Sequence, residues 1–490
     1  MLGQKTLLLN PPLVNGIAFT RQGRCQERED VLGTTKPPYT LALMAALLRD
    51  AGCEVRLIDA TAERLSVEQV ISRLEGDGFT PSLIIFPSTT PTLDSDVAHV
   101  ARLKAHYRAP IFCFGPHAST VPAVSMSRVP DVDGMFVGEP EDGVMQLAAL
   151  ESLDGMPAIT SLTFRPQGAA GPVVPHRAHG SFSTFLTMPY PAWDLVSLKH
   201  YALPLVDKPY VMVETSRGCP YSCDFCVAPI HQGHKFRERD AKALVDEIER
   251  THREHGIEFF YLWGDTVTLN VKTFTAFCDE LIARKLPIQW FGNARADNLT
   301  DPAFVHRLKR AGCWMLALGV ESESDEVRKD MAKRLEGKKI RTAFQNMREA
   351  GIKSFAFFIF GYPGETLSTM DQTIKYAIDL DPDFANFYPA VPYPGTALHE
   401  KVRREGLLPE RAESDWARLE YSYYVLEGNG LNHELVMDAI NRAKRRFFLR
   451  PSYLARHVGD MTKLATTKWH VAWQIGSRML LGTRATGGRP

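Results

Sequence analysis

The residues of this sequence best suited to chemistry are three cysteines in the run Cys219-Pro-Tyr-Ser-Cys223-Asp-Phe-Cys226. Thiolates this close in sequence, following an apolar strand pattern, can converge on one soft metal centre. A structural zinc usually takes four protein ligands, and His231 or His234 could complete such a site because no fourth cysteine lies nearby. Three cysteines on a four-iron cluster would instead leave one iron open, which a cluster needs if it is to bind and reduce a small molecule. The run predicts a metal centre of one of these two kinds.

The remaining cysteines are isolated in the sequence: Cys25, Cys53, Cys113, Cys278 and Cys313. Cys53, Cys113 and Cys278 stand in apolar contexts and are most simply packed core residues. Eight cysteines in 490 residues are too few for a disulfide scaffold. The clustered thiols therefore indicate metal binding or catalysis in a reducing compartment.

Residues 1–150 alternate between strand and helix patterns. The expected strands are Thr6–Asn10, Glu54–Asp59, Leu83–Phe86, Ile111–Phe114 and Gly134–Val137, and helical patterns cover Leu41–Ala51 and Asp94–His106. This alternation predicts an α/β domain with a parallel, doubly wound, Rossmann-like sheet. Ligands of such sheets sit at the carboxyl ends of the strands.

Residues 151–208 are interpreted as a connector, with a hairpin of Ser161–Arg165 and Val173–His176 and a stretch punctuated by prolines. The alternation then resumes. The expected strand cores are Tyr210–Glu214, Phe259–Trp263, Ile288–Phe291, Met315–Val320, Ser354–Ile359 and Ala385–Tyr388, separated by helical patterns. Six strand–helix units predict a partial (β/α) barrel over residues 209–400, because a closed barrel needs eight.

Residues 401–490 show no clear strand pattern, and we expect a mainly helical, basic region. From Asn441 to Pro490 there are eleven Lys and Arg and one Asp, so this segment carries +10 and the rest of the chain −10. The run Arg442–Arg450 is basic and aromatic. It is either a solvated helix face or a contact with an anionic substrate, a partner or a membrane surface.

The composition is that of an ordinary globular protein, with 44% hydrophobic and 23% charged residues, which excludes a wholly disordered or fibrous chain. Fifty-seven basic and fifty-seven acidic residues cancel, so no overall field attracts nucleic acid. No stretch reaches the roughly 18–20 apolar residues of a membrane-spanning helix, and the apolar run at Leu7–Leu9 is too short for a secretory signal. We expect a cytoplasmic protein that does not bind nucleic acid as its main role.

The cysteine spacing, with Phe225 before the last cysteine, resembles that of the radical S-adenosylmethionine (SAM) superfamily. Further segments at successive strand ends carry the resemblance: Gly264-Asp265-Thr266, Gly319-Val320-Glu321-Ser322 and Phe358-Ile359-Phe360-Gly361-Tyr362-Pro363-Gly364-Glu365. The first of these departs from the Gly-Gly-Glu that the family more often has. The resemblance implies that Cys219, Cys223 and Cys226 hold a [4Fe-4S] cluster.

The same resemblance assigns contacts to SAM. Its amino group is expected at Gly264, Asp265 and Thr266, its ribose and carboxylate at Glu321 and Ser322, and its adenine at Gly361 and Pro363, with Phe225 beside the cluster. Arg295, after the third strand, is a candidate contact for the SAM carboxylate or the substrate, and a surface salt bridge is the alternative.

In that family the reduced cluster donates an electron to the sulfonium of SAM. The C–S bond breaks, and the resulting 5′-deoxyadenosyl radical takes a hydrogen atom from an unactivated carbon. This chemistry belongs to the cofactor, while the protein holds and shields the reactants. A small-molecule substrate and an electron donor such as flavodoxin or ferredoxin are implied.

A Rossmann-like domain before such a core resembles the cobalamin (B12)-binding subgroup of the superfamily. Lys36-Pro37-Pro38-Tyr39 matches its first helix entry, and later strand-end loops match at Ser88–Pro91, Gly115–Ala118 and Val137–Pro140. The contacts implied for cobalamin are Pro11, Pro12, Thr89, Thr90, Gly115, His117, Gly138 and Glu139. The loop after the first strand lacks the cobalt-binding His of cobalamin mutases, and His117 is not assigned as a cobalt ligand.

The resemblance implies that the chain is a cobalamin-dependent radical SAM enzyme that methylates an unactivated carbon. A non-methylating oxidation, cyclisation or rearrangement of a substrate that could be lipid-like is an alternative. A non-catalytic cobalamin or iron–sulfur sensor is an alternative of another class, although a sensor would not need SAM-binding segments at strand ends. Tyr388 and Tyr393, in the segment that closes the sixth strand, are expected on the substrate side.

Overall fold

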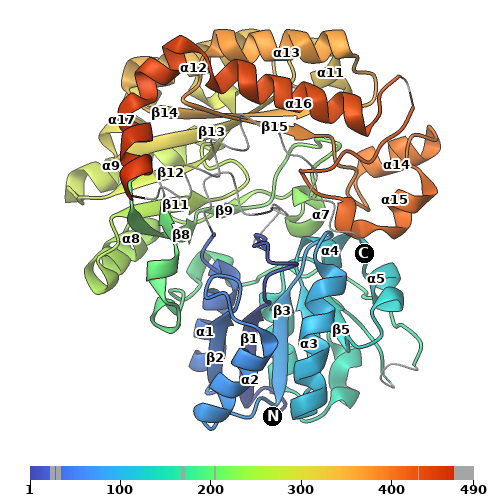
Figure 1. Ribbon diagram of the computed structural model, residues 1–490. Coiled ribbons are helices and arrows are strands. Elements are labelled where there is room, and N and C mark those ends of the chain that lie inside the picture. Colours follow the sequence, from blue (N-terminus) through green and yellow to red (C-terminus); the bar gives the residue numbers. More distant parts are fainter. Residues whose placement is uncertain (22–27, 29–34, 167–170, 204–205, 429, 468–490) are drawn as a thin grey trace.

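A computed structural model describes the chain except residues 22–27, 29–34, 167–170, 204–205, 429 and 468–490. Cys25 and the end of the basic C-terminal segment lie outside the described residues. Two sheets dominate the fold, one from the N-terminal part and a larger one stacked beyond its strand ends (Figure 1).

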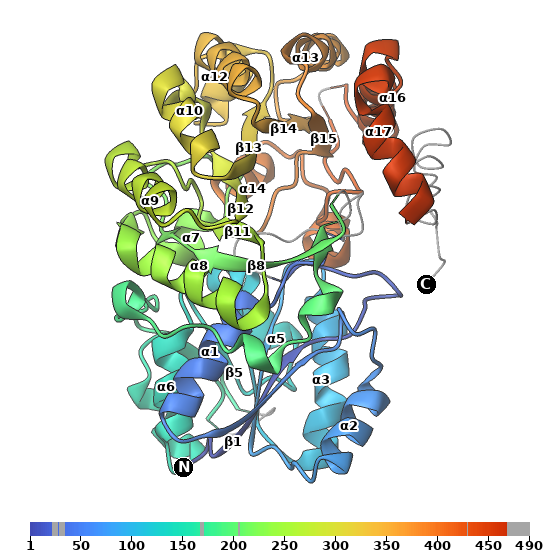
Figure 2. The same cartoon turned by 90° about the vertical axis from the view of Figure 1, so that its left-hand side faces the viewer.

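The N-terminal sheet has six strands in the order β2-β1-β3-β4-β5-β6. They are β1 (Lys5–Asn10), β2 (Glu54–Asp59), β3 (Leu83–Pro87), β4 (Ile111–Phe114), β5 (Gly134–Phe136) and β6 (Leu162–Phe164). The helices are α1 (Tyr39–Asp50), α2 (Val67–Gly76), α3 (Leu93–Tyr107), α4 (Pro116–Thr120), α5 (Pro122–Arg128) and α6 (Glu141–Ala149). Helices α1 and α6 lie on one side of the sheet and α2 and α3 on the other (Figure 2). Strand β3 is buried along its whole length, as expected where helices cover both faces.

The segment interpreted as a connector contributes to both sheets. Strand β6 pairs antiparallel with β5, and Phe164 forms a bridge with Val174 in the expected hairpin. Strand β7 (Ala202–Leu203) pairs antiparallel with the first strand of the second sheet. The sequence pattern missed that these two short strands extend the neighbouring sheets.

The second sheet has the order β15-β14-β13-β12-β11-β8-β7, and all of its strands except β7 run parallel. The six parallel strands are β8 (Lys208–Glu214), β11 (Phe259–Trp263), β12 (Gln289–Ala294), β13 (Cys313–Glu321), β14 (Lys353–Phe360) and β15 (Phe384–Pro389). Helices α8 (Ala241–His255), α9 (Val271–Arg284), α10 (Pro302–Arg310), α11 (Asp325–Asp330), α12 (Gly337–Ala350) and α13 (Leu367–Leu380) alternate with them. Short elements β9 (Ser216–Arg217), α7 (Ala228–Gln232) and β10 (Arg237–Glu238) follow β8. This is the predicted partial barrel, with its helices on the outer face (Figure 2).

The described C-terminal part is helical, with α14 (Ala397–Arg404), α15 (Glu410–Ser414), α16 (His433–Phe448) and α17 (Pro451–Thr467). Helix α16 packs on β15, where the ring centroids of Phe447 and Phe387 are 6.2 Å apart. Part of the basic run forms ion pairs within the protein: Arg442 pairs with Asp371, and Arg450 pairs with Asp381. None of the described helices has the length and hydropathy needed to cross a membrane.

One buried cluster of charges joins the two sheets. Arg217, which follows β8, donates two hydrogen bonds of 3.1 and 2.7 Å to the carboxylate of Glu141 and one of 2.8 Å to Glu214. It also lies 3.2 Å from Glu139, which Arg237 contacts as well. All three carboxylates and Arg217 are at most 3% exposed. Burial alone would raise the pKa of Glu139, but Arg217 and Arg237 together bring it below its usual range.

A second contact links the same two regions. The hydroxyl of Ser119, at the end of α4, lies 2.9 Å from Nδ1 of His231 in α7 and accepts a hydrogen bond of 3.0 Å from the backbone N–H of Gly138. Helix α4 lies directly against α7 (Figure 1). The strand-end loops of the N-terminal sheet therefore contact the segment that carries the three clustered cysteines.

Replacing Arg217 by Leu should cost about 3–5 kcal/mol of unfolding free energy, because three buried carboxylates would lose their shared cation. Urea titration at pH 7 measures this loss, which should shrink near pH 5 as Glu214, whose pKa burial raises to about 7, takes up a proton. Arg307→Leu is the matched control, since Arg307 pairs with Asp279 at side chains 40% and 53% exposed, and it should cost less than about 1 kcal/mol. Similar losses for the two variants would show that the buried cluster contributes little.

Candidate functional site

The three cysteines lie in one loop directly after β9. Cys219 is buried, whereas Cys223 and Cys226 are half-buried, and all three side chains are thiols. The loop begins at Gly218, which has a φ of +82°, and a Cβ there would lie 2.2 Å from the carbonyl oxygen of Lys235. Only glycine fits this position. The loop then turns on itself, since the N–H of Cys226 donates to the carbonyl of Cys223 at 3.1 Å.

The donor set fits an iron–sulfur cluster better than a single zinc ion. In the described part of the chain, no three His, Cys, Asp or Glu side chains form a group that could hold one metal ion. Nδ1 of His231 is occupied by Ser119, and burial lowers the pKa of His231 to about 4. His234 is exposed. In a four-iron cluster each thiolate binds a different iron, so the three sulfurs need not meet at one point.

Asp224, between the second and third cysteines, ties this loop to three distant segments. Its N–H donates to the carbonyl of Met331 at 3.1 Å, and its carbonyl accepts from the N–H of Leu398 at 2.9 Å. Its carboxylate accepts a hydrogen bond from the hydroxyl of Tyr362, which follows β14. Sequence reasoning missed both Asp224 and Tyr362, because nothing in the local pattern shows contacts across more than a hundred residues.

Arg295 lies beside the cysteine loop and is 6% exposed, so the salt bridge that it forms is a buried one and not the surface one given as the alternative. Its guanidinium carbon sits 3.7 Å from the ring centroid of Tyr221, within the cysteine run. It also donates to the carbonyl of Lys333 at 3.1 Å and pairs with Asp297 at 3.2 Å. Arg295 therefore braces the loop, and a direct contact with SAM or substrate remains a prediction.

Glu321 ends β13 with a φ of +67° and is buried. Its Oε1 lies 2.7 Å from Nζ of Lys333. A Cβ on Gly319 would lie 2.2 Å from this carboxylate and 2.6 Å from Nζ of Lys333, so glycine leaves room for the pair. Lys333 is a second residue that the sequence did not reveal, and it supplies the charge that a buried carboxylate requires. Ser322 is fully buried beside this pair, 3.3 Å from the hydroxyl of Thr373.

Gly264, after β11, faces the start of the cysteine loop. A Cβ there would lie 2.6 Å from Oγ of Ser216 and 2.9 Å from Oγ1 of Thr215. Among the described residues, Oγ of Ser216 is buried without a hydrogen-bond partner. Thr266 is buried and donates to the carbonyl of Asp265 at 2.8 Å. Glycine at position 264 leaves room for the Ser216 and Thr215 side chains, and the unsatisfied Ser216 hydroxyl fits a polar group of SAM at this strand end.

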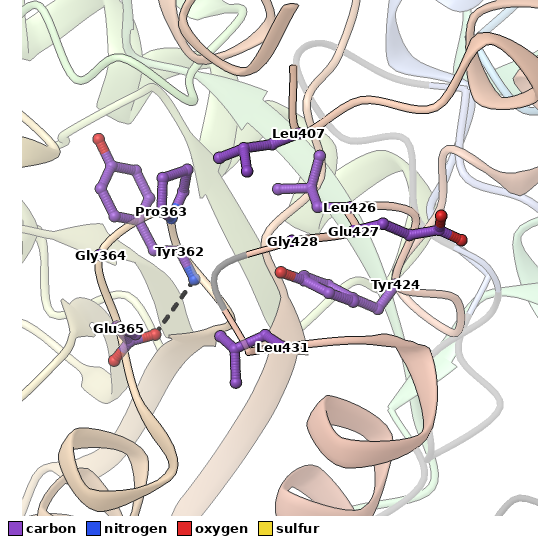
Figure 3. A pocket seen from close by; sticks show the side chains of 10 residues that line it. All are labelled: Tyr362, Pro363, Gly364, Glu365, Leu407, Tyr424, Leu426, Glu427, Gly428 and Leu431. Carbon is purple, nitrogen blue, oxygen red and sulfur yellow. Dashed lines mark hydrogen bonds between the residues drawn. The ribbon is translucent and has the colours of Figure 1, made fainter. Parts of the chain in front are cut away.

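The loop after β14 is fixed by Glu365 and Tyr424 (Figure 3). Tyr424 donates to the carbonyl of Gly361 at 2.9 Å, and the N–H of Tyr362 donates to Glu365 at 3.2 Å. Gly361 has a φ of +75°, and a Cβ there would lie 2.6 Å from the Tyr424 ring. Pro363 lines the small pocket next to these residues. Burial raises the pKa of Glu365 to about 8, so this carboxyl is protonated at neutral pH.

The residues predicted to contact cobalamin lie at the strand ends of the N-terminal sheet, but they are buried in contacts with the protein itself. The two ring nitrogens of His117 lie 3.1 Å from Thr90 and 2.8 Å from Ser125, and burial lowers the His117 pKa to about 3. Thr89 lies 2.8 Å from Thr92. His117 is therefore a neutral structural histidine, and both of its ring nitrogens are already engaged.

The glycines at these strand ends are explained by packing within the fold. A Cβ on Gly115 would lie 2.5 Å from the carbonyl oxygen of Ser88, and one on Gly138 would lie 2.6 Å from that of Gly180. Glu139 binds the two arginines of the buried charge cluster. Close backbone approach within the fold therefore requires glycine at both positions.

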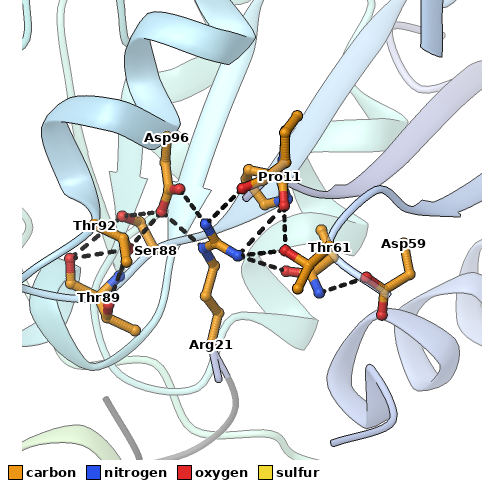
Figure 4. Close-up of polar contacts among 10 residues, drawn as sticks. Pro11, Arg21, Asp59, Thr61, Ser88, Thr89, Thr92 and Asp96 are labelled. Atoms are coloured by element: carbon orange, nitrogen blue, oxygen red, sulfur yellow. Dashed lines mark hydrogen bonds and ion pairs between the residues drawn. The ribbon is translucent and has the colours of Figure 1, made fainter. Parts of the chain in front are cut away.

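Pro11 and Pro12 follow β1, and their carbonyls are bound by Arg21 at 3.3 and 3.1 Å (Figure 4). Arg21 forms a buried ion pair of 2.6 Å with Asp96. The loop after β1 therefore offers no imidazole, and Arg21 occupies its carbonyls. This donor set suits a corrin that is held without a protein ligand from this loop on its cobalt.

Tyr388 and Tyr393 lie at the end of the sixth parallel strand, near Tyr421. The centroid of the Tyr421 ring is 4.5 Å from that of Tyr388 and 6.4 Å from that of Tyr393. Tyr388 is half-buried, whereas Tyr393 is buried. Tyr388 thus remains a candidate for substrate contact. Tyr393 is buried and contacts Tyr421, which in turn contacts Tyr388.

Two known families match separate parts of the chain. The Radical SAM superfamily matches residues 213–377, and the B12 binding domain matches residues 30–148. The chain therefore carries a B12 binding domain followed by a radical SAM domain. The predicted resemblance and fold class are confirmed, and the family cofactors are a [4Fe-4S] cluster, SAM and cobalamin.

Curated relatives of this radical SAM protein are enzymes. An uncharacterized methyltransferase of Pyrococcus horikoshii is 27% identical over 457 residues, covering 93% of this chain and 94% of the relative. An anaerobic magnesium-protoporphyrin IX monomethyl ester cyclase of Cereibacter sphaeroides is 26% identical over 86% of this chain and 68% of the relative. This radical SAM protein is therefore an enzyme with a small-molecule substrate, and the sensor interpretation is set aside.

Two solved structures share the fold of this radical SAM enzyme. The radical SAM methyltransferase TsrM from Kitasatospora setae, with cobalamin and a [4Fe-4S] cluster bound, has a TM-score of 0.64 at 18% identity, over 85% of this chain and 84% of TsrM. The cobalamin-dependent enzyme OxsB has a TM-score of 0.68 at 15% identity, over 96% of this chain and 72% of OxsB. The arrangement of two sheets is thus that of known two-domain enzymes.

Glu365 should make stability fall at alkaline pH. Its folded-state pKa of about 8 lies above the usual 4.5, so the folded protein binds more protons than the unfolded chain between these values. Unfolding free energy therefore decreases as pH rises through this window, by about 1 kcal/mol between pH 7 and 9. Glu365→Gln should remove this part of the pH dependence, measured by urea titration at several pH values. Glu349→Gln, at an exposed position, should leave it in place, and a parallel change in both variants would contradict the assignment.

Proposed function

We propose that this enzyme methylates a carbon atom of its substrate in a reaction that uses cobalamin and a SAM-derived radical. The observation that carries the proposal is the direct contact between the two cofactor-bearing regions. Loops at the strand ends of the B12-binding domain reach the cysteine loop through Glu139 and Arg217 and through Ser119 and His231. A curated relative that matches nearly the full length is named a methyltransferase, which supports the same outcome.

When bound, the cluster and SAM supply a carbon-centred radical, and cobalamin supplies the methyl group. The chain's own residues would have three tasks. Asp224 and Tyr362 hold the cysteine loop against β14. Arg295 stacks on Tyr221 and keeps the same loop closed. The buried cluster around Arg217 keeps the B12-binding domain at a fixed distance from the cysteine loop, because any separation would expose or unpair buried charges.

The residues proposed to hold SAM are those at the strand ends. Gly264 and the unsatisfied Ser216 hydroxyl would receive a polar group of SAM, and Glu321, neutralised by Lys333, would accept from the ribose hydroxyls. The loop of Gly361 and Pro363, fixed by Tyr424, would lie against the adenine. Each of these loops lies at the carboxyl end of a parallel strand, where such folds bind ligands.

We further propose that flavodoxin or ferredoxin delivers the electron, and that the enzyme works in the cytoplasm. The half-buried thiols of Cys223 and Cys226 need a reducing compartment to stay available for iron. The membrane contact predicted for the basic C-terminal run is less favoured, because Arg442 and Arg450 already form ion pairs within the protein.

Anaerobically reconstituted enzyme should hold about four irons per chain. With SAM and a strong reductant it should release 5′-deoxyadenosine. Replacing Cys219, Cys223 and Cys226 together by Ala should abolish the iron content, the visible absorbance of the cluster and the release of 5′-deoxyadenosine. Replacing Cys53, Cys113 and Cys278 by Ser instead should leave iron binding in place in whatever fraction folds, since these cysteines are buried elsewhere.

Retained SAM cleavage in the first triple variant would overturn the assignment of the cluster ligands. With SAM labelled in its methyl group, mass spectrometry of an extract from the source cells should show label in one product. Release of 5′-deoxyadenosine without methyl transfer to any compound would support the assignment as a radical SAM enzyme but would overturn the proposed methylation.

The second prediction for this function concerns cobalt. Both ring nitrogens of His117 are engaged, and the Pro11–Pro12 loop has no imidazole. We therefore expect no protein nitrogen on cobalt. If the cofactor's own tail base is displaced as well, as we predict, electron paramagnetic resonance of the cob(II)alamin-loaded enzyme should show axial lines without nitrogen superhyperfine splitting. His117→Ala should leave that spectrum unchanged. Splitting that disappears in His117→Ala would mean that this side chain rearranges to bind cobalt, and failure to bind any cobalamin would remove the methylation proposal.

A further inference from the structure

The inner face of the partial barrel differs from its outer face in a regular way. Along β14 and β15 the side chains alternate between buried residues and half-buried ones. The buried set packs outward on the helices, as shown by the contact of Phe387 with Phe447 of α16. The half-buried set therefore faces the inside of the curved sheet. It is the part of the barrel surface that a substrate could touch.

Four aromatic residues on this inner side form what we call the aromatic wall: Phe355, Phe357, Tyr388 and Tyr421. The rings of Phe355 and Phe357 are stacked with centroids 4.8 Å apart and planes at 30°. The ring centroids of Phe357 and Tyr388 are 6.1 Å apart with planes at 22°, and those of Tyr388 and Tyr421 are 4.5 Å apart with planes at 33°. All four side chains are half-buried. The four rings therefore form a row stacked face to face, and the ring edges along this row are what a ligand on the inner side can contact.

Strands β11 and β12, further along the same sheet, repeat this chemistry. Tyr261 on β11 and Phe291 on β12 stack at 4.8 Å with planes only 8° apart. The polar groups along these strands are uncharged: Asn293 donates to the Tyr261 hydroxyl at 3.1 Å, and Asn386 donates to the Tyr388 hydroxyl at 2.6 Å. The inner face therefore offers flat apolar surface with a few neutral hydrogen-bonding groups.

Charge is nearly absent from this face in the described residues. Of the half-buried positions on β12 to β15, only Lys353 is charged. Lys353 is the first residue of β14, at the end away from the proposed SAM site, and its Nζ lies 5.7 Å from the Phe384 ring centroid. An anionic or cationic ligand placed here would lose its hydration without gaining a counter-charge, which is costly.

The aromatic wall is continuous with the proposed SAM site. Phe357 lies four residues before Gly361 on the same chain segment, which is roughly 13 Å along an extended strand. A molecule lying along the wall would reach the strand end where a radical would form only if it is long in at least one dimension. A compact, charged metabolite would fit neither the length nor the polarity of this face.

We propose that the substrate is an uncharged, planar, multi-ring molecule that lies with its ring plane against the aromatic wall. This proposal rests on the proposed function for its location but not for its chemistry, which follows from the stacked rings and the lack of charge. The face of a planar ring system gains from edge-to-face contact with the Phe and Tyr rings beyond the burial of apolar area. The two Asn–Tyr pairs would orient neutral polar substituents.

The test uses full-length, cluster-loaded enzyme under anaerobic conditions and two probes with the same ring system. 1-Pyrenemethanol is neutral, and 1,3,6,8-pyrenetetrasulfonate is anionic. Fluorescence titration should show that the neutral probe binds about tenfold or more tightly than the anionic one, because the face cannot compensate charge. Farnesol, which is neutral but not planar, should displace the neutral probe poorly.

Variants locate the probe. Phe357→Leu keeps the apolar bulk and removes the ring, so it should weaken 1-pyrenemethanol binding by roughly twofold to tenfold. Tyr190→Leu is the matched control, because Tyr190 is 38% exposed and stacks on Arg250 elsewhere, and it should leave binding unchanged. Circular dichroism and iron content check folding, and Phe355→Leu replaces Phe357→Leu if the latter does not fold.

Preference for the tetrasulfonate, efficient displacement by farnesol, or equal binding by Phe357→Leu and wild type would each overturn the substrate class. Release of 5′-deoxyadenosine is measured in the same samples. Loss of probe binding with intact SAM cleavage would reject the substrate class alone. Probe binding without any SAM cleavage would instead reject the proposed function.

Discussion

Three carboxylates that share one buried guanidinium hold the N-terminal domain and the partial barrel of this enzyme in a fixed relative position. Glu139 and Glu141 come from the end of the N-terminal sheet, and Glu214 ends the first strand of the barrel, with Arg217 between them. Burial raises the pKa of Glu214 to about 7, which shows how finely the charges are balanced there. Because buried charges cannot be unpaired cheaply, this junction resists sliding or opening. Arg217 stands two residues before Cys219, so the same interaction also anchors the start of the cysteine loop.

From that anchor the cysteine loop is held at several points along its length. Gly218 lets the chain pass close to Lys235, Tyr221 stacks under Arg295, and Asp224 is bound by Tyr362. These contacts come from loops at the ends of different strands. A site that must position a reactive group benefits from such support, since small displacements cost much of the rate. The loop's shape is thus determined by tertiary contacts rather than by its own eight residues.

The sequence was informative where a pattern is local. Apolar runs predicted β2, β4 and β11 at the bounds that the structure has, because hydrophobic patterning acts within a few residues. The cysteine spacing predicted the metal loop for the same reason. Lys333, Arg217 and Arg21 could not be predicted, since a buried charge is defined by partners distant in sequence. The constraint on Gly115 and Gly138 at the N-terminal rim is also not local, because it comes from close backbone packing on Ser88 and Gly180.

The distribution of charge explains why the two ends of the barrel strands can have different tasks. At the carboxyl ends, charges occur in compensated pairs such as Glu321 with Lys333, so polar cofactors can be received without leaving a net buried charge. Along the inner faces of the same strands, ring stacking replaces ion pairing, as between Phe357 and Tyr388. A polar cofactor is therefore favoured at the strand ends and disfavoured deeper along the sheet, while an apolar substrate has the opposite preference. This separation lets both bind next to each other without competing for one surface, which a reaction between a SAM-derived radical and a carbon atom requires.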